Sequence, residues 1–307
     1  MTIIQKIKLI QQISGLTQAQ LANRLGVTFA ALNRWVNGKA TPRQSAQQRI
    51  DELYREYTGQ KQIPEDILEA KKAVIIKRAK NHRYVLGEIL GNPDIQNQFL
   101  LSLTYNSNRI EGSSLSENET AAILFHNAAL PNKSLTEQLE AKNHQAALEY
   151  LFQYLTKRKP PNEELILRLH SILMNGIRSD AGQYRVHAVR IVGGYVPTAN
   201  FIKISKLMNA LVVDIQKKNK DVIQTVSAIH SRFEQIHPFA DGNGRVGRLL
   251  MHAMLLRANS PPAVIRQENK RFYLAYLNKA QLQMDFSLLE DFICDAVMEG
   301  YNILERK

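Results

Sequence analysis

The sequence of 307 residues has little of several residue types, and these absences exclude whole classes of protein. It has a single cysteine, Cys294, so a disulfide within the chain and a zinc site of several cysteines are excluded. No apolar run approaches the roughly 20 residues of a membrane-spanning helix, and the first residues show no secretory leader pattern. We therefore expect a cytoplasmic protein without membrane contact, in which Cys294 is a buried, small apolar side chain.

Acidic residues are missing from one part of the chain only. The first 50 residues contain seven basic and no acidic side chains, which is more than half of the net charge of +12. A small basic segment attracts phosphate groups. A solvated basic surface without any partner would have the same composition, so charge alone leaves both interpretations open.

Two short helical patterns follow one another in this basic segment. Thr17 can cap a helix that runs to residue 25, a turn follows at Gly26, and a second helix covers residues 28–36. Residues 3–57 resemble the helix-turn-helix domains of the Cro/XRE repressor family, whose second helix enters the major groove of DNA. The resemblance implies a DNA-binding domain at residues 1–58 that has Trp35 in its core. It implies base contacts by Thr28, Phe29, Asn33 and Arg34, and phosphate contacts by Gln18 and Lys39.

Beyond a break with Gly59 and Pro64, the chain is a succession of amphipathic helical patterns, which predicts an all-α fold class. One segment differs, because residues 186–196 partly alternate apolar and polar side chains around Gly193-Gly194 and predict a small β-hairpin. The hairpin is either a connecting ribbon or an exposed edge that pairs with an extended segment of another protein. The helices are expected at about 65–90, 94–108, 116–127, 134–157, 162–175, 203–218, 221–235, 243–258, 268–282 and 286–304.

The strongest chemical signal is one continuous stretch near residue 240. Gly242 and Gly244 allow backbone N–H groups to converge at the start of a helix, an arrangement that binds phosphate. Arg245 and Arg248 project from the same side of that first turn and indicate more than one phosphate. The stretch is His237-Pro238-Phe239-Ala240-Asp241-Gly242-Asn243-Gly244-Arg245-Val246-Gly247-Arg248.

Two further side chains of this stretch complete its chemistry. Asp241 stands at the entrance of the loop, where a carboxylate beside phosphates usually holds Mg²⁺. His237 can take up a proton near neutral pH. A zinc site of His230 and His237 is a poor alternative, because no further ligands can be identified. The residues alone therefore indicate a nucleotide polyphosphate, a magnesium ion and a general base.

This stretch matches the signature of the Fic family without departure, and the resemblance covers about residues 64–307. Fic proteins are helical, and most transfer AMP from ATP to a Ser, Thr or Tyr hydroxyl of a protein. The resemblance implies that His237 is the catalytic base and that Asp241 holds Mg²⁺. The other implied nucleotide contacts are Gly242, Asn243, Gly244, Arg245 and Arg248 for the phosphates, and Tyr273 and Gln281 for the adenine. A flap with Val189, Arg190, Ile191 and Val192 is implied to dock the target chain by strand addition.

A second, shorter motif lies upstream. Ser107-Asn108-Arg109-Ile110-Glu111-Gly112 is similar to the inhibitory motif of Fic proteins that have an N-terminal inhibitory helix. The resemblance implies that Glu111 pairs with Arg248 and turns bound ATP into an unproductive pose. Alternatively, Glu111 is a solvated glutamate at the end of a helix that Gly112 terminates, because such a helix end would have the same sequence. The expected Fic domain is 59–307, with the inhibitory motif in 59–130 and the catalytic core in 131–307.

Several functions remain open at this stage. We favour a protein adenylyltransferase that uses ATP and Mg²⁺, modifies a protein or itself, is inhibited by Glu111 and is coupled to DNA binding. A transcription regulator could instead use the Fic body only as a sensor or dimerisation platform. The same fold could remove AMP, with Glu111 activating water, or use another nucleotide or a phosphocholine donor. Repressor-type modules usually bind DNA as dimers, so a homodimer is a further alternative.

Overall fold

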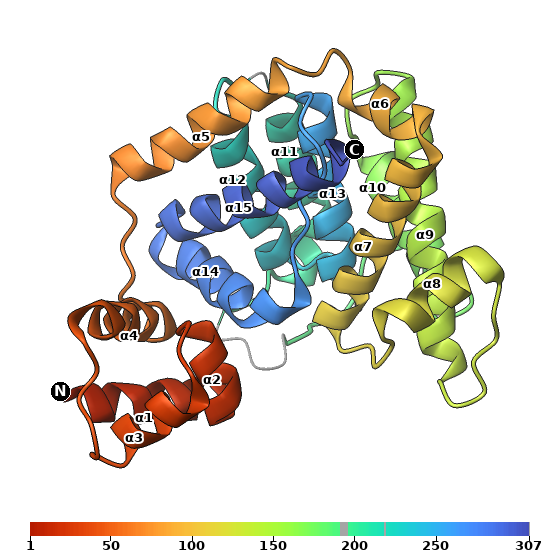
Figure 1. Ribbon diagram of the computed structural model, residues 1–307. Coiled ribbons are helices and arrows are strands. Elements are labelled where there is room, and N and C mark those ends of the chain that lie inside the picture. The colour runs from red at the N-terminus through yellow and green to blue at the C-terminus, as the bar shows by residue number, and fades with distance from the viewer. Residues whose placement is uncertain (191–195, 218, 307) are drawn as a thin grey trace. The chain divides into compact units, whose positions relative to one another are not determined.

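The structure is a computed structural model that describes residues 1–190, 196–217 and 219–306. It divides into two compact units, Met1–Ile63 and Pro64–Lys307, each of which is described by itself (Figure 1). Every regular element of the described residues is a helix, which confirms the all-α fold class. No helix among them combines the length and the apolar character needed to span a membrane.

The first unit is a small four-helix domain around an apolar core that includes Leu21, Leu32 and Ile50. The two predicted helices are confirmed as α2 and α3. The hydroxyls of Thr17 and Thr28 accept N–H groups of their first turns. Trp35 is 8% exposed and lies in the same core, as expected. The elements are α1 (Ile3–Ser14), α2 (Gln18–Arg24), α3 (Phe29–Val36) and α4 (Gln44–Tyr57).

The second unit is a helical body in which α13 lies at the centre. Figure 1 shows α13 surrounded by other helices, and it contacts α7, α9, α10 and α12. This explains why nearly all of its side chains are buried. The elements are α5 (Glu65–Ala79), α6 (Val85–Gly91), α7 (Pro93–Glu111), α8 (Glu117–His126), α9 (Leu135–Thr156), α10 (Glu163–Leu173), η1 (Phe201–Lys203), α11 (Ile204–Gln216), α12 (Val222–Ile236), α13 (Asn243–Arg257), η2 (Gln267–Asn269), α14 (Lys270–Gln283) and α15 (Ser287–Leu304).

The helix expected at 65–90 is wrong in one respect, because the structure has two helices there, α5 and α6. The cause is a side chain far along the sequence. Asn259 Nδ2 donates to the carbonyl oxygens of Ala79 at 3.4 Å and His82 at 2.8 Å, and its Oδ1 accepts the N–H of Val85 at 2.9 Å. One amide thus satisfies the end of α5 and the start of α6, which allows the chain to turn between them.

The predicted β-hairpin is not seen. Residues 186–190 and 196, which belong to the predicted hairpin, contain no strand, and residues 191–195, which include Ile191 and Val192, fall outside the described residues. Some carbonyl groups of the described residues in this region accept hydrogen bonds from side chains. The hydroxyl of Thr198, for example, donates to the carbonyl oxygen of Val189 at 2.8 Å.

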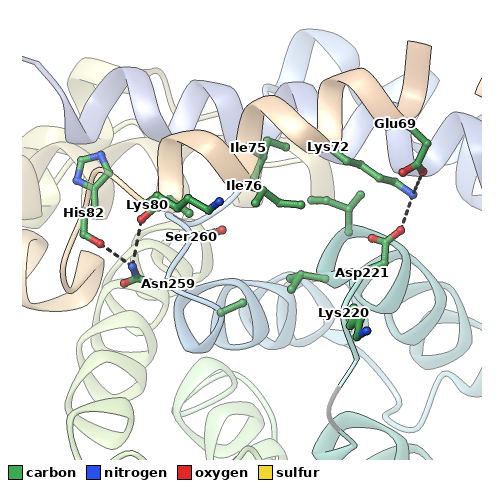
Figure 2. Close-up of a pocket in the computed structure, with 14 residues that line it drawn as sticks. Glu69, Lys72, Ile75, Ile76, Lys80, His82, Lys220, Asp221, Asn259 and Ser260 are labelled. Carbon is green, nitrogen blue, oxygen red and sulfur yellow. Dashed lines mark hydrogen bonds and ion pairs between the residues drawn. The ribbon is translucent and has the colours of Figure 1, made fainter. Parts of the chain in front are cut away.

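A cavity of about 570 Å³ lies between α5, the start of α12 and the residues that follow α13 (Figure 2). Ile75 and Ile76 of α5 line its apolar wall. At one end, Lys72 pairs with Glu69 at 3.1 Å and with Asp221 at 2.6 Å. Because none of the residues of the His237–Arg248 stretch lines this cavity, it is separate from the candidate active site.

Candidate active site

The His237–Arg248 stretch forms a tight turn that joins α12 to α13. His237 ends α12 in a left-handed conformation (φ 51°), and Gly242 has φ 77° directly before α13. Asn243 supports the turn from inside, since its Oδ1 accepts the N–H of Phe239 and its Nδ2 donates to the Phe239 carbonyl, both at 2.9 Å. Both polar ends of Asn243 are therefore engaged within the turn, and a phosphate contact by this side chain stays a prediction.

His170 of α10 holds the turn from outside the motif. Its ring stacks on Phe239 with centroids 3.7 Å apart. Its Nδ1 accepts the N–H of Gly182 at 2.8 Å, which leaves Nε2 to donate to the carbonyl of Asp241 at 3.1 Å. Burial lowers the pKa of His170 to about 4, so the ring is neutral and this pattern is stable at pH 7. No sequence signal links His170 to a turn 71 residues away.

His237 has the protonation state that a general base needs. Burial lowers the pKa of its imidazole, and the positive charge of Arg185 lowers it further. Its Nδ1 lies 3.3 Å from the carbonyl oxygen of Glu234. Because a carbonyl only accepts, the proton is on Nδ1, and Nε2 keeps a lone pair for an incoming proton. His237 can therefore accept a proton through Nε2 near neutral pH.

Arg248 is buried beside the start of α13 and is held by α7. Its Nε donates to the hydroxyl of Ser107 at 2.9 Å, and Nη2 donates to the Ser107 carbonyl at 3.1 Å and to Glu111 Oε1 at 2.7 Å. Its Nη1 is buried and has no hydrogen-bond partner among the described residues. The guanidinium thus has an unused donor of the kind that an anion would satisfy.

The Glu111 carboxylate also covers the first turn of α13. A Cβ placed on Gly244 would overlap Glu111 Oε1. The free N–H groups of a helix start attract an anion at this position. Partial burial raises the pKa of Glu111, but Arg248, and less strongly Arg245 and Lys270, more than offset this and keep the pKa below its ordinary value. Glu111 is therefore an ionised group at the place where the sequence predicts a phosphate. The motif ends at Gly112, which closes α7 with φ 111°.

The structure does not bring the two motif arginines together on one ligand. Arg245 Nη1 donates to Glu140 Oε1 of α9 at 2.8 Å, and Nη2 lies 3.8 Å from Met174 Sδ. Although they are three residues apart, Arg245 reaches α9 and Arg248 reaches α7, because α13 contacts both of these helices. A contact of Arg245 with the outer phosphates stays a prediction, and Glu140 is a partner that no local pattern in the sequence indicates.

Asp241 fits the role of a magnesium ligand. Its side chain is 56% exposed at the entrance of the turn, and Oδ1 accepts the N–H of Gly242 at 2.6 Å. Among the residues that the structure describes, no group of three or more His, Cys, Asp or Glu could hold a metal ion. Mg²⁺ is usually held by one or two carboxylates together with phosphates and water, so a single exposed Asp241 beside a phosphate position suits it.

The two side chains predicted to contact adenine lie in the packing between α14 and α12. Tyr273 is 1% exposed, and its hydroxyl is 2.5 Å from Nε2 of His230. Gln281 Nε2 donates to the carbonyl of Ser231 at 3.0 Å. The structure therefore engages both side chains with α12, and an adenine contact by either stays a prediction.

The predicted DNA-contacting residues lie on α2, on α3 and at their ends. Phe29 is 53% exposed, and Arg34 and Lys39 are also exposed. Asn33 Nδ2 donates to Gln18 Oε1 at 3.1 Å, so these two side chains link α3 to α2. Thr28 uses its hydroxyl as the cap of α3. In the described structure, Arg34 and Lys39 are basic groups on this part of the domain that face solvent, as is Arg24 at the end of α2.

Comparison with known protein families agrees with the two-part organisation. Residues 154–255 match the Fic/DOC family, and residues 11–57 match the helix-turn-helix family. The chain carries a Fic domain. The Fic match contains the turn after His237 together with α12 and most of α13, and the helix-turn-helix match contains α2, α3 and α4.

Related proteins and structures agree with this assignment. A protein adenylyltransferase Fic of Nematostella vectensis is 35% identical over 181 residues, which is 57% of this chain and 42% of the relative. A Fic domain containing signaling protein of Bacteroides thetaiotaomicron has the same fold, with a TM-score of 0.66, 24% identity, and coverage of 76% of this chain and 98% of that one. A Fic family protein of Desulfovibrio desulfuricans has a TM-score of 0.65 at 26% identity, covering 80% of this chain and 77% of that one. The chain spans less than half the length of the Nematostella relative.

Proposed function

We propose that this protein is a protein adenylyltransferase that transfers AMP from ATP to a protein hydroxyl and binds DNA through its first domain. The observation that carries the proposal is a neutral imidazole, His237, at one end of a turn whose other end is the start of a buried helix with a spare arginine donor. A base and an anion position joined by one short turn suit the attack of a hydroxyl on a phosphate. The names of the Nematostella relative and of similar proteins support this activity.

In the proposed reaction, the target hydroxyl oxygen forms a bond to the α-phosphorus of ATP. The bond from that phosphorus to the oxygen bridging to the β-phosphate breaks, and pyrophosphate leaves. His237 Nε2 accepts the hydroxyl proton while its Nδ1–H stays on the Glu234 carbonyl. The N–H groups at the start of α13 and the Arg248 guanidinium stabilise the negative charge. Mg²⁺, held by Asp241, would neutralise phosphate charge when it is bound.

Glu111 restrains the reaction in this proposal. Its carboxylate pairs with Arg248 and lies over Gly244, where the outer phosphates of ATP would also seek these donors. Two anions cannot share the same donors without repulsion, so ATP binds in a productive pose only when Glu111 leaves. Removal of the carboxylate should therefore activate the enzyme.

Intact-mass analysis after incubation with ATP and Mg²⁺ tests this function. We expect Glu111→Gly to increase the rate at which the protein attaches AMP to itself about 10-fold or more, since a charge-assisted hydrogen bond is worth roughly 1.5–3 kcal/mol. Adding His237→Ala to that variant should lower the rate about 10²–10⁴-fold. A Glu111→Gly protein that forms no AMP adduct on itself or on added lysate proteins contradicts the proposal.

A further inference from the structure

One buried arginine outside the Fic signature is bonded both to the catalytic turn and to the segment that contains the predicted flap. The Arg185 side chain is 4% exposed. Its Nε donates to the carbonyl of His237 at 2.7 Å, Nη1 to that of His187 at 2.7 Å, and Nη2 to that of Ala199 at 2.6 Å. Its backbone N–H donates to the carbonyl of Pro238 at 3.0 Å. One residue therefore contacts three separate parts of the chain.

The positive charge of this guanidinium is compensated by carbonyl groups, and no carboxylate of the described residues pairs with it. Burial lowers the pKa of Arg185, and no carboxylate in the described part of the chain raises it. Burying a charge without an opposite charge costs several kcal/mol. The cost is offset because Nη2 also reaches the Ile236 carbonyl at 3.4 Å, so Arg185 sits on the last carbonyls of α12, where the helix dipole is negative.

The bonds to His187 and Ala199 close the base of the segment between them. The described residues beside these two anchors, 187–190 and 196–199, are here named the flap segment, and they include the predicted docking residues Val189 and Arg190. Because Nη1 and Nη2 belong to one planar group, both ends of the flap segment are held within a few ångström of each other. Nε of the same planar group donates to the His237 carbonyl, so one guanidinium holds both the flap ends and the backbone of His237.

We propose that Arg185 is a positioning residue that fixes the flap segment relative to His237, so that a target hydroxyl carried by the flap arrives within reach of the imidazole. This rests on the proposed function. Arg185 touches neither the start of α13 nor the guanidinium of Arg248, so it acts on the alignment of the target and leaves ATP binding alone. Small displacements of reacting atoms are costly, with about 1 Å enough for roughly 100-fold in rate.

Arg185→Lys is the informative variant. Lysine keeps the charge but has one ammonium with three donors, which cannot replace a planar fork that serves several carbonyls at once. Arg178→Lys is the matched control, because Arg178 lies seven residues earlier and pairs with Asp180 in an exposed ion pair. Both variants are made in the full chain that carries Glu111→Gly.

Two measurements decide the proposal. We expect Arg185→Lys to lower the kcat of AMP transfer about 100-fold while the Kd for ATP stays within about two-fold of the Arg178→Lys control. Hydrogen exchange should show lost protection in residues 187–190 and 196–199 and at the turn after His237, and little change elsewhere. Equal kcat in the two variants, or lost protection across the whole of residues 64–307, overturns the proposal. If the Glu111→Gly parent transfers no AMP, the proposed function fails, and hydrogen exchange alone still decides whether Arg185 joins the flap segment to the turn.

Discussion

Glu234 lies in the last turn of α12 and His237 follows the end of that helix, and burial makes both of them neutral at pH 7. Burial lowers the pKa of His237 and raises the pKa of Glu234 to about 8, although Arg248 acts against the second shift. The charges that remain near the turn then include those of the arginines, Glu111, Glu140 and Asp241. Neutral His237 is a base, whereas neutral Glu234 leaves the guanidinium of Arg248 available to another anion.

The pH dependence of transfer should reflect His237. Its folded pKa lies below the ordinary 6.5, so the imidazole loses its proton at a lower pH than in a free peptide. We expect kcat/KM of the Glu111→Gly variant to stay level between about pH 7 and 8 and to fall only below about pH 6.5. A rate profile over pH 5–8.5, corrected for unfolding, measures this. An acid limb centred above pH 7 contradicts it.

Glu234 should make the fold less stable as the pH rises. Its pKa is 4.5 in a free chain and about 8 here, so the folded state binds the proton more tightly. The resulting stabilisation is complete below about pH 4.5 and is lost as the pH rises through about 8. Glu234→Gln removes the ionisation, so its free energy of unfolding should exceed that of the wild type at pH 8.5 by on the order of a few kcal/mol and match it at pH 5. Urea unfolding followed by circular dichroism at both pH values measures the difference, and an equal difference at both contradicts the assignment.

The pair of helices α12 and α13 shows how packing between elements places the site. Their close approach occurs at Gly247, where an added Cβ would lie 2.5 Å from Glu234 Oε1 and 3.1 Å from Phe233 Cδ1. Glycine costs helical stability in the middle of a helix. Here it lets the two helices approach each other just beyond the catalytic turn, and so supports the geometry in which one helix ends at His237 and the next starts at Asn243.

Gly247→Ala should therefore be destabilising, in spite of the better helix propensity of alanine. We expect a loss of about 1–3 kcal/mol, since overfilling a packed contact forces neighbouring side chains to move. Gly91→Ala is the matched control, because Gly91 also lies in a helix and nothing is within 4 Å of its added Cβ. Thermal unfolding followed by circular dichroism compares the two variants. A Gly247→Ala protein as stable as Gly91→Ala contradicts this account of the packing.

The chain as a whole combines two units that have separate cores, and it offers a probe for one of them. Trp35 is the single tryptophan of the sequence, and it lies in the core of the first unit. Its fluorescence therefore reports unfolding of residues 1–63, while circular dichroism is dominated by the larger helical unit. Basic groups exposed at α3 and Lys39 give the first unit a surface suited to DNA phosphates.

DNA binding should depend on Arg34 and on salt. We expect Arg34→Ala to weaken binding and, if the guanidinium contacts a phosphate, to reduce the slope of log K against log salt by about 1. Lys77→Ala, an exposed lysine of α5 in the other unit, is the control. Titration of a fluorescent DNA duplex at several salt concentrations gives both quantities. Identical curves for Arg34→Ala and Lys77→Ala contradict a role of α3 in DNA binding, and a shift after incubation with ATP and Mg²⁺ would show coupling of the two units.

Local sequence was enough to predict most elements and the central turn. Short-range patterns describe the cap of α2 by Thr17, the boundaries of the helices from α7 onward and the turn between His237 and Asn243, because these depend on neighbours a few residues away. The pairing of Glu111 with Arg248 was predicted only through resemblance to a family, because its partners are 137 residues apart.

Contacts across the fold decided the rest. His170 on the turn, Glu140 on Arg245 and Arg185 on His237 join residues 52 to 105 positions apart, and no periodicity in the sequence encodes such distances. The break between α5 and α6 depends in the same way on Asn259. Local backbone geometry follows from propensity and capping, whereas the partner of a buried polar group depends on which helices pack together, and that is determined only when the whole core forms.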